Sequence, residues 1–237
     1  MSAFFQLNTP DADTLDPKTF RRFAELIYAK SGIKLGPQKE ALVQARVRKR
    51  MRHLNVNSYK DYLNIVAEDA TGREIVELLD AIATNVTHFF REERHFRFLS
   101  ETLKKWSKAG QTRFRLWSAA CSSGEEPFSM AMTVLESLPA SSDVKILATD
   151  ISTKILAKAK QGEYLLRNIG KVSNAMLARY FTKHGEECRI NDSVRSLVRF
   201  ARLNLAEPPF PMKGPLDAVF CRNVMIYFDN NVRRRLL

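Results

Sequence analysis

One stretch of the chain carries most of the information about its fold: Leu216-Asp217-Ala218-Val219-Phe220-Cys221-Arg222-Asn223-Val224-Met225-Ile226-Tyr227-Phe228-Asp229. Its first half is an apolar run rich in β-branched and aromatic residues, which predicts a buried strand. Arg222 and Asn223 interrupt the run before it resumes at Val224. A polar pair at the carboxyl end of a buried strand is where an open α/β sheet presents groups to a ligand. The alternative is a strand whose end simply meets solvent.

A second stretch joins a strand to a helix through small residues. The predicted strand at residues 114–117 runs into a small-residue segment ending at Gly124, and a helix with apolar periodicity follows. Small residues let the backbone approach a ligand closely, and the first N–H groups of the helix point at it. Glu125 and Glu126 stand at the helix start. They either complement the helix dipole or accept hydrogen bonds from a cationic or hydroxyl-bearing ligand.

A third stretch, residues 144–150, reads as another buried strand and ends in Asp150. An acid at the end of the second strand is the usual anchor for ribose hydroxyls in βαβ nucleotide sites. The alternative is that Asp150 or Ser152 caps the next helix, residues 154–160. Both roles are compatible, because the strand end and the helix start share a turn.

These stretches together resemble the chemotaxis receptor methyltransferases of the CheR family, which are S-adenosylmethionine-dependent protein-glutamate O-methyltransferases. The resemblance covers about residues 20–237. The matching strings, in the family's order, are TNVTHFFRE at 84–92, WSAA at 117–120 with GEEP at 124–127, TDI at 149–151, NL at 204–205 and FCRNVMIYF at 220–228.

The resemblance implies an α/β fold with a Rossmann-like class I methyltransferase sheet, a small N-terminal helical domain and an inserted small antiparallel β-subdomain. Family members continue for some tens of residues beyond Leu237, so we expect the C-terminal part of the sheet to be missing. The implied organisation is a flexible tail (1–16), a helical domain with a basic helix (17–83), a linker contributing to the cofactor site (84–92) and a methyltransferase domain (93–237) with the β-subdomain at about 178–203.

The resemblance also implies a set of cofactor contacts. Arg91 matches the partner of the methionyl carboxylate, for which a guanidinium fork is well shaped; the alternative is a helix-surface ion pair with Glu92 or Glu93. Glu125 matches the acid facing the methionyl ammonium, and the sequence does not separate it from Glu126. The remaining matched contacts are Asn85 and Thr87 in the linker, Asp150 at the ribose, Asn204 and Leu205 at the adenine, and Asn223 and Val224 near the sulfonium.

The implied reaction needs no general base, because a receptor glutamate is already ionised near neutral pH. Arg222 and Tyr227 are candidates for orienting the substrate carboxylate. The four histidines are expected to be surface or packing residues. S-adenosylmethionine is the implied methyl donor, with S-adenosylhomocysteine as product and no metal. A Glu207-Pro208-Pro209-Phe210 segment imitates a motif of amino-group methyltransferases, but it follows Asn204-Leu205 and reads as a proline-rich turn.

The chain carries 38 Lys and Arg against 26 Asp and Glu, a net charge of +12, which attracts polyanionic or acidic partners. The charge concentrates on one predicted helix starting near Pro37, whose apolar stripe includes Val43, Val47 and Met51. A solvated helix face is usually mixed in sign, so a face of one sign favours an acidic partner. The predicted substrate-binding residues are Arg46, Arg48, Lys49, Arg50 and Arg52.

The implied partners are the acidic methylation helices of chemoreceptors, bound by a monomer with no nucleic acid and no membrane insertion. Residues 183–187 form a short loop with one glycine, which resembles members that dock without a C-terminal peptide tether. Three cysteines without metal-like spacing, and the lack of a signal peptide, favour the cytoplasm. The alternatives are a nucleic-acid methyltransferase using the same charge, or a non-catalytic module that binds S-adenosylmethionine or its product.

Overall fold

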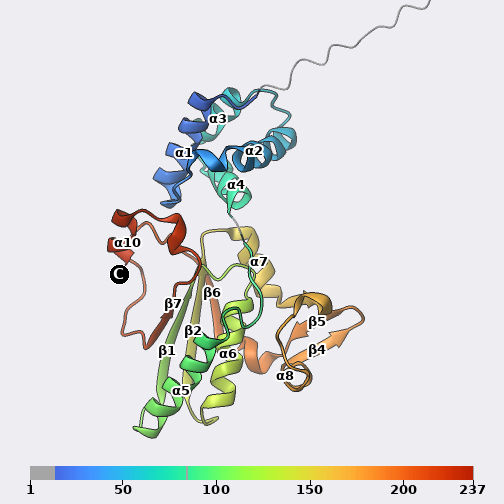
Figure 1. The fold of residues 1–237 in the computed structure, drawn as a ribbon, viewed down its shortest axis with the longest axis vertical. Coiled ribbons are helices and arrows are strands. Elements are labelled where there is room, and N and C mark those ends of the chain that lie inside the picture. The colour runs from blue at the N-terminus through green and yellow to red at the C-terminus, as the bar shows by residue number, and fades with distance from the viewer. Residues whose placement is uncertain (1–13, 84, 237) are drawn as a thin grey trace, which may run out of the picture. The chain divides into compact units, whose positions relative to one another are not determined.

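The computed structural model describes residues 14–83 and 85–236, which form two compact units divided after Ala83 (Figure 1). Most of the predicted tail, and Thr84 of the predicted linker, lie outside the described residues. None of the helices in the described ranges is long and apolar enough to cross a bilayer.

The first unit is the helical bundle that the sequence predicts. It contains α1 (Pro17–Ser31), the 3-10 turn η1 (Pro37–Lys39), α2 (Glu40–Leu54), α3 (Tyr59–Glu68) and α4 (Arg73–Ile82). Helix α1 ends where Gly32 takes a left-handed conformation, and the Ser58 hydroxyl caps α3 by accepting from the Asp61 amide. The apolar stripes meet in a core that includes Phe23, Val47 and Leu78.

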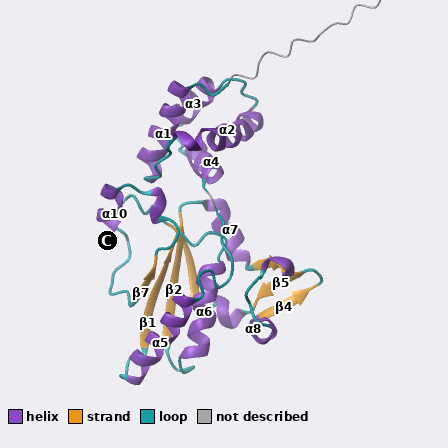
Figure 2. Ribbon diagram, viewed as in Figure 1, coloured by secondary structure: helices purple, strands orange, loops and turns teal. Residues whose placement is uncertain are grey.

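The second unit is built on a four-stranded parallel sheet in the order β6-β2-β1-β7. The strands are β1 (Arg113–Ala119), β2 (Asp143–Asp150), β6 (Val198–Arg202) and β7 (Ala218–Phe220). Helix α6 (Glu125–Ser137) connects β1 to β2, and α7 (Thr153–Gln161) begins the connection from β2 to β6. Helix α5 (Arg94–Lys108) packs beside α6, and both cover one face of the sheet (Figure 2). All the strands therefore direct their carboxyl ends to the same edge.

The strand predicted at the start of the 216–229 stretch is present as β7, but it is short and lies at the sheet edge. Its central residue, Val219, is 48% exposed, so the prediction of a buried strand is wrong in that respect. The apolar run after Asn223 forms the 3-10 turn η3 (Met225–Tyr227), and α10 (Asn230–Leu236) follows. An edge strand carries the same β-branched and aromatic residues as a central one, so composition did not separate the two.

A second, three-stranded antiparallel sheet confirms the predicted β-subdomain but corrects its boundaries. Its order is β3 (Glu163–Leu165), β5 (Glu187–Ile190) and β4 (Phe181–His184), with η2 (Leu166–Asn168) and α8 (Asn174–Tyr180) between β3 and β4, and α9 (Asp192–Arg195) after β5. The alternating segment near residue 200, predicted to belong here, is β6 of the main sheet. An edge strand of a parallel sheet also alternates apolar and exposed positions, which explains the error.

Candidate functional site

The carboxyl ends of the main-sheet strands bring together most of the predicted cofactor residues. The turn after β1 lies against the end of β2: the Ser122 amide donates to the Asp150 carboxylate at 2.9 Å, and the Cys121 amide donates to the Thr149 carbonyl at 2.8 Å. Asn204 and Leu205 follow β6, and Asn223 follows β7. Parallel strand ends at one edge form the usual ligand crevice of such sheets.

Unfavourable backbone conformations concentrate at this edge. In the described part of the chain, six non-glycine residues have positive φ, and one of them, Asn55, ends helix α2 of the first unit. The other five are Phe90, Glu92, Ala120, Ser122 and Asn223. Left-handed non-glycine residues persist only where the surroundings hold them, and they gather at ligand sites. The backbone thus marks the same region as the sequence motifs.

Helix α6 opens tightly against its neighbours. Gly124 has φ +96°, and a Cβ there would lie 3.0 Å from the Tyr164 hydroxyl and 3.1 Å from the Ala159 Cβ. Only glycine fits this conformation without strain. This close packing of Gly124 against Tyr164 and Ala159 fixes the start of helix α6 and therefore the position of Glu125, its first residue.

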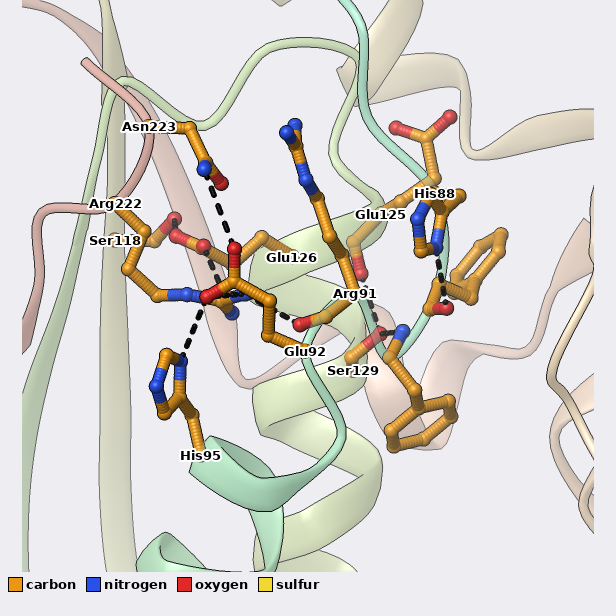
Figure 3. Close-up of polar contacts among 12 residues, drawn as sticks. His88, Arg91, Glu92, His95, Ser118, Glu125, Glu126, Ser129, Arg222 and Asn223 are labelled. Atoms are coloured by element: carbon orange, nitrogen blue, oxygen red, sulfur yellow. Dashed lines mark hydrogen bonds and ion pairs between the residues drawn. The ribbon is translucent and has the colours of Figure 1, made fainter. Parts of the chain in front are cut away.

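The two acids at the start of α6 have different surroundings. The Glu125 carboxylate accepts from the Ser123 hydroxyl at 2.6 Å, and burial raises its pKa. The Glu126 carboxylate accepts from the Ser118 hydroxyl at 2.7 Å and lies 3.4 Å from Arg222; burial raises its pKa to about 7. In Figure 3, Glu126 points towards Ser118 and Arg222, whereas Glu125 points to the side that also receives the Arg91 guanidinium. The structure thus distinguishes two acids that the sequence left equivalent.

Arg222 lies inside a network rather than on an open surface. Its side chain is 11% exposed and packs over the rings of Phe96 and Phe220, 5.4 and 5.6 Å from their centroids. The guanidinium lies 3.3 Å from the Glu92 carboxylate and also pairs with Glu126. It donates a hydrogen bond to the Arg91 carbonyl. We call Arg222, Glu92, Glu126 and this carbonyl the Arg222 network.

These contacts argue against the predicted role of Arg222 as a substrate contact, because its guanidinium already faces two protein carboxylates and its Nε and Nη1 atoms are buried away from solvent. Tyr227, its predicted companion, is half-buried in η3.

Arg91 lies in the turn before α5, not on a helix surface. Its guanidinium donates to the Val86 carbonyl at 2.7 Å. The Glu92 carboxylate is engaged with the Asn223 amide at 3.3 Å, with His95 at 3.2 Å and with Arg222, and its pKa is lowered, chiefly by the Asn223 hydrogen bond. Figure 3 shows the Arg91 guanidinium turned away from this cluster. The arrangement favours a ligand role over the alternative ion pair.

The remaining linker residues reach the same edge through α6 and the β1 turn. The Ser122 hydroxyl donates to the Asn85 carbonyl at 3.1 Å, which holds Asn85 beside the turn after β1, with half-buried Thr87 two residues further along. The Phe90 amide donates to the Ser129 hydroxyl at 3.0 Å. Sequence reasoning missed Ser118, Ser129 and Glu92 as supports. A buried serine in a strand such as β1 was the available signal, because a buried hydroxyl needs a partner.

On the ribose and adenine side, Asp150 is 7% exposed and accepts from the amides of Ser122 and Ser152. The Ser152 hydroxyl caps α7, so the cap and the acid share one turn as expected. Asn204 accepts from the Ala206 amide at 3.1 Å, and the Leu205 side chain is buried. Val224 is half-buried at the start of η3. The Glu207–Phe210 segment is irregular, with bends at Glu207 and Pro209 directly after a turn at Leu205 and Ala206, and Phe210 packs edge-on against Trp117.

The predicted basic face on α2 is only partly open. Arg46, Lys49 and Arg52 are exposed, and Arg48 lies over the Tyr59 ring, 6.0 Å from its centroid. Arg50 instead makes ion pairs with Glu74 at 2.7 Å and with Glu77 at 2.9 Å, with its side chain 12% exposed. The expectation of an open basic face therefore does not hold for Arg50, because acids on α4 already neutralise it.

The donor set fits S-adenosylmethionine, which carries a sulfonium and an ammonium beside one carboxylate. Buried carboxylates at Glu125 and Asp150 suit the cationic and hydroxyl-bearing parts, and the Arg91 guanidinium suits the carboxylate. A parallel α/β sheet with this donor set at its carboxyl edge fits a class I S-adenosylmethionine-dependent methyltransferase.

Comparison with known proteins identifies the family. Residues 85–237 match the model described as "CheR methyltransferase, SAM binding domain", and residues 18–83 match "CheR methyltransferase, all-alpha domain". The chain belongs to the CheR methyltransferase family, as the sequence motifs predicted.

Similar proteins carry chemotaxis names. The chain is 37% identical to the "Chemotaxis protein methyltransferase" of Escherichia coli K12, over 92% of this chain and 77% of the relative. It is 40% identical to the "Probable chemotaxis protein methyltransferase" of Rhizobium etli, over 89% of this chain and 82% of the relative. It is 36% identical to "Chemotaxis protein methyltransferase 2" of Pseudomonas aeruginosa, over 92% of this chain and 79% of the relative.

Proposed function

We propose that this protein methylates glutamate side-chain carboxylates on the cytoplasmic helices of chemoreceptors and forms glutamate methyl esters for sensory adaptation. The observation that carries the proposal is family membership across both units, with relatives whose names state chemotaxis methyltransferase activity. The strand-end chemistry supports it, since acids and one guanidinium converge where a cationic methyl donor would bind.

The proposed cofactor contacts follow from the site. Arg91 holds the methionyl carboxylate, Glu125 the ammonium and Asp150 the ribose hydroxyls. Asn204 and Leu205 contact the adenine, Asn223 and Val224 lie near the sulfonium, and Asn85 and Thr87 complete the linker side. When bound, S-adenosylmethionine supplies a methyl group already activated as a sulfonium. Glu125 is preferred over Glu126 because Glu126 is engaged by Ser118 and Arg222.

The protein's part in the reaction is to align and desolvate the reacting groups. The accepting carboxylate is ionised near neutral pH, since an unperturbed glutamate has a pKa of about 4.3. No residue is needed to remove a proton. Opposite charges on the carboxylate and the sulfonium diminish as the methyl group moves, so a dry, well-aligned site favours transfer. We propose that half-buried Tyr227 orients the accepting carboxylate.

The receptor side of the proposal rests on charge. The exposed cations on α2, Arg46, Lys49 and Arg52, complement an acidic helix surface, and Arg48 adds to them beside Tyr59. We further propose that docking needs no C-terminal peptide tether, because the β4–β5 connection contains only Gly185 and Glu186.

The proposal is tested by offering labelled S-adenosylmethionine to the purified protein with two acceptors, a chemoreceptor cytoplasmic fragment and structured RNA. We expect label on the receptor fragment, mapped by peptide mass spectrometry to glutamate side chains. Label on RNA alone would replace the proposal with nucleic-acid methylation. Binding of S-adenosylmethionine without label on either acceptor would replace it with a sensor function.

A further inference from the structure

The Arg222 guanidinium joins three segments that each carry a proposed cofactor residue. From the end of β7 it reaches the linker turn, where it donates to the Arg91 carbonyl and pairs with Glu92. It also pairs with Glu126 in the first turn of α6, one residue after Glu125. Phe96 and Phe220 pack against it and exclude water from its side chain. A lysine would not reproduce these contacts, because its three donors share one nitrogen, whereas a guanidinium spreads five donors over three nitrogens in a rigid plane.

The segments that Arg222 joins are conformationally unfavourable by themselves. Glu92 has φ +57° and Asn223 has φ +59°, and the Asn223 amide donates to the Glu92 carboxylate at 3.3 Å. Phe90, at φ +52°, is held by the hydrogen bond that its backbone amide donates to the Ser129 hydroxyl on α6. Turns of this kind relax when the contacts that hold them are removed. Arg222 is therefore placed to keep the 90–92 turn fixed and, with it, the direction of the Arg91 side chain.

We propose that Arg222 is a positioning residue: it holds the strained 90–92 turn against the start of α6, so that the Arg91 guanidinium faces the methionyl carboxylate, and it does not contact the receptor. The proposal rests on the proposed function only for the identity of the ligand that Arg91 binds. It replaces the sequence-based hypothesis that Arg222 orients the substrate carboxylate. It predicts that loss of Arg222 weakens cofactor binding and loosens the linker much more than it slows the transfer step.

The test compares Arg222→Met with the wild-type protein and with Arg115→Met as a matched control. Arg115 is an 18%-exposed arginine in an ion pair with Asp143, at the opposite end of β1 and β2. Hydrogen exchange of residues 86–96 is measured by mass spectrometry in the ligand-free proteins, and S-adenosylmethionine affinity by calorimetry. We expect faster exchange in this segment and a roughly 10- to 100-fold weaker affinity for Arg222→Met alone. The transfer rate at saturating S-adenosylmethionine should stay within about threefold of wild type.

A second variant keeps the test decisive if Arg222→Met does not fold. Removing Arg222 alone leaves Glu126 buried without its cation, so Arg222→Met/Glu126→Gln removes both charges together. The same faster exchange and weaker affinity are expected, because the Arg91 carbonyl and Glu92 still lose their partner. Wild-type exchange and affinity with a large loss of transfer rate would overturn the proposal and restore Arg222 as a substrate contact. Failure of the proposed function would appear separately, as wild-type protein that methylates no receptor.

Discussion

Glu126→Gln should stabilise the methyltransferase unit increasingly as the pH rises above the ordinary glutamate pKa. Burial raises the Glu126 pKa to about 7 from an ordinary value of 4.5. The difference between these two pKa values corresponds to a free energy on the order of 3 kcal/mol. Because the folded-state pKa is raised, the unfolded chain releases this proton first. The contribution to stability is therefore full below pH 4.5 and is lost as pH rises through 7.

Glutamine keeps an oxygen acceptor for the Ser118 hydroxyl but carries no charge to desolvate. It also leaves Arg222 with only Glu92 as an ionic partner, which offsets part of the gain. We expect the variant to be more stable than wild type by about 1–3 kcal/mol at about pH 8.5 and nearly equal to it at about pH 5.

Urea unfolding followed by tryptophan fluorescence measures this difference in the correct unit, because both tryptophans of the chain, Trp106 and Trp117, lie in it. The reasoning is refuted if the difference in unfolding free energy is the same at both pH values. It is also refuted if the variant is the less stable protein at about pH 8.5.

Four further predictions concern cofactor binding, stability and receptor recognition. Glu125→Gln should weaken S-adenosylmethionine binding about tenfold in calorimetry, and more than Glu126→Gln, because a charged partner of the ammonium is lost; equal effects would contradict the distinction between the two acids. Gly124→Ala should destabilise the unit by about 1–3 kcal/mol in the same urea assay, since φ is +96° and the Tyr164 hydroxyl is 3.0 Å away; an unchanged midpoint would contradict this. Arg50→Ala should lower the free energy of unfolding of the helical unit by about 3–5 kcal/mol in thermal melts followed by circular dichroism, because the buried Glu74 loses its cation and keeps the Tyr62 hydroxyl as a hydrogen-bond donor. By contrast, alanine at the exposed cations should leave stability and cofactor affinity unchanged and reduce receptor kcat/KM in a salt-dependent way; these cations are Arg46, Lys49 and Arg52.

Much of the fold follows from local signals in the sequence. Gly32 and Ser58 mark helix ends as glycine and serine usually do, and periodic apolar residues place α2 and α6. The assignment of β6 failed because alternation reports only that one side of a strand is exposed. Whether Val198–Arg202 pairs in parallel with β2 or antiparallel in the small sheet depends on a contact between residues about fifty positions apart. Local pattern does not encode such pairings.

In the candidate site, too, local motifs were predictable from the sequence and contacts between distant residues were not. Motif positions placed Glu125, Asp150 and Asn223 at one sheet edge, where the structure has them. The sequence did not reveal that Arg222 faces inward, since two of its partners, Arg91 and Glu92, lie in a turn more than a hundred residues earlier. For the same reason it treated Arg50 as one of five equivalent cations. Arginine pairs with distant acids, and those partners appear only when the chain is folded.

The central claim is carboxyl methylation, and the chemistry of the product tests it most directly. Purified protein, labelled S-adenosylmethionine and a chemoreceptor cytoplasmic fragment are incubated, and the labelled receptor is then exposed to mild base. We predict label on the receptor that is released as volatile methanol, because only an ester is cleaved under those conditions. Label that survives the base treatment, or a receptor that takes up none, would contradict the account.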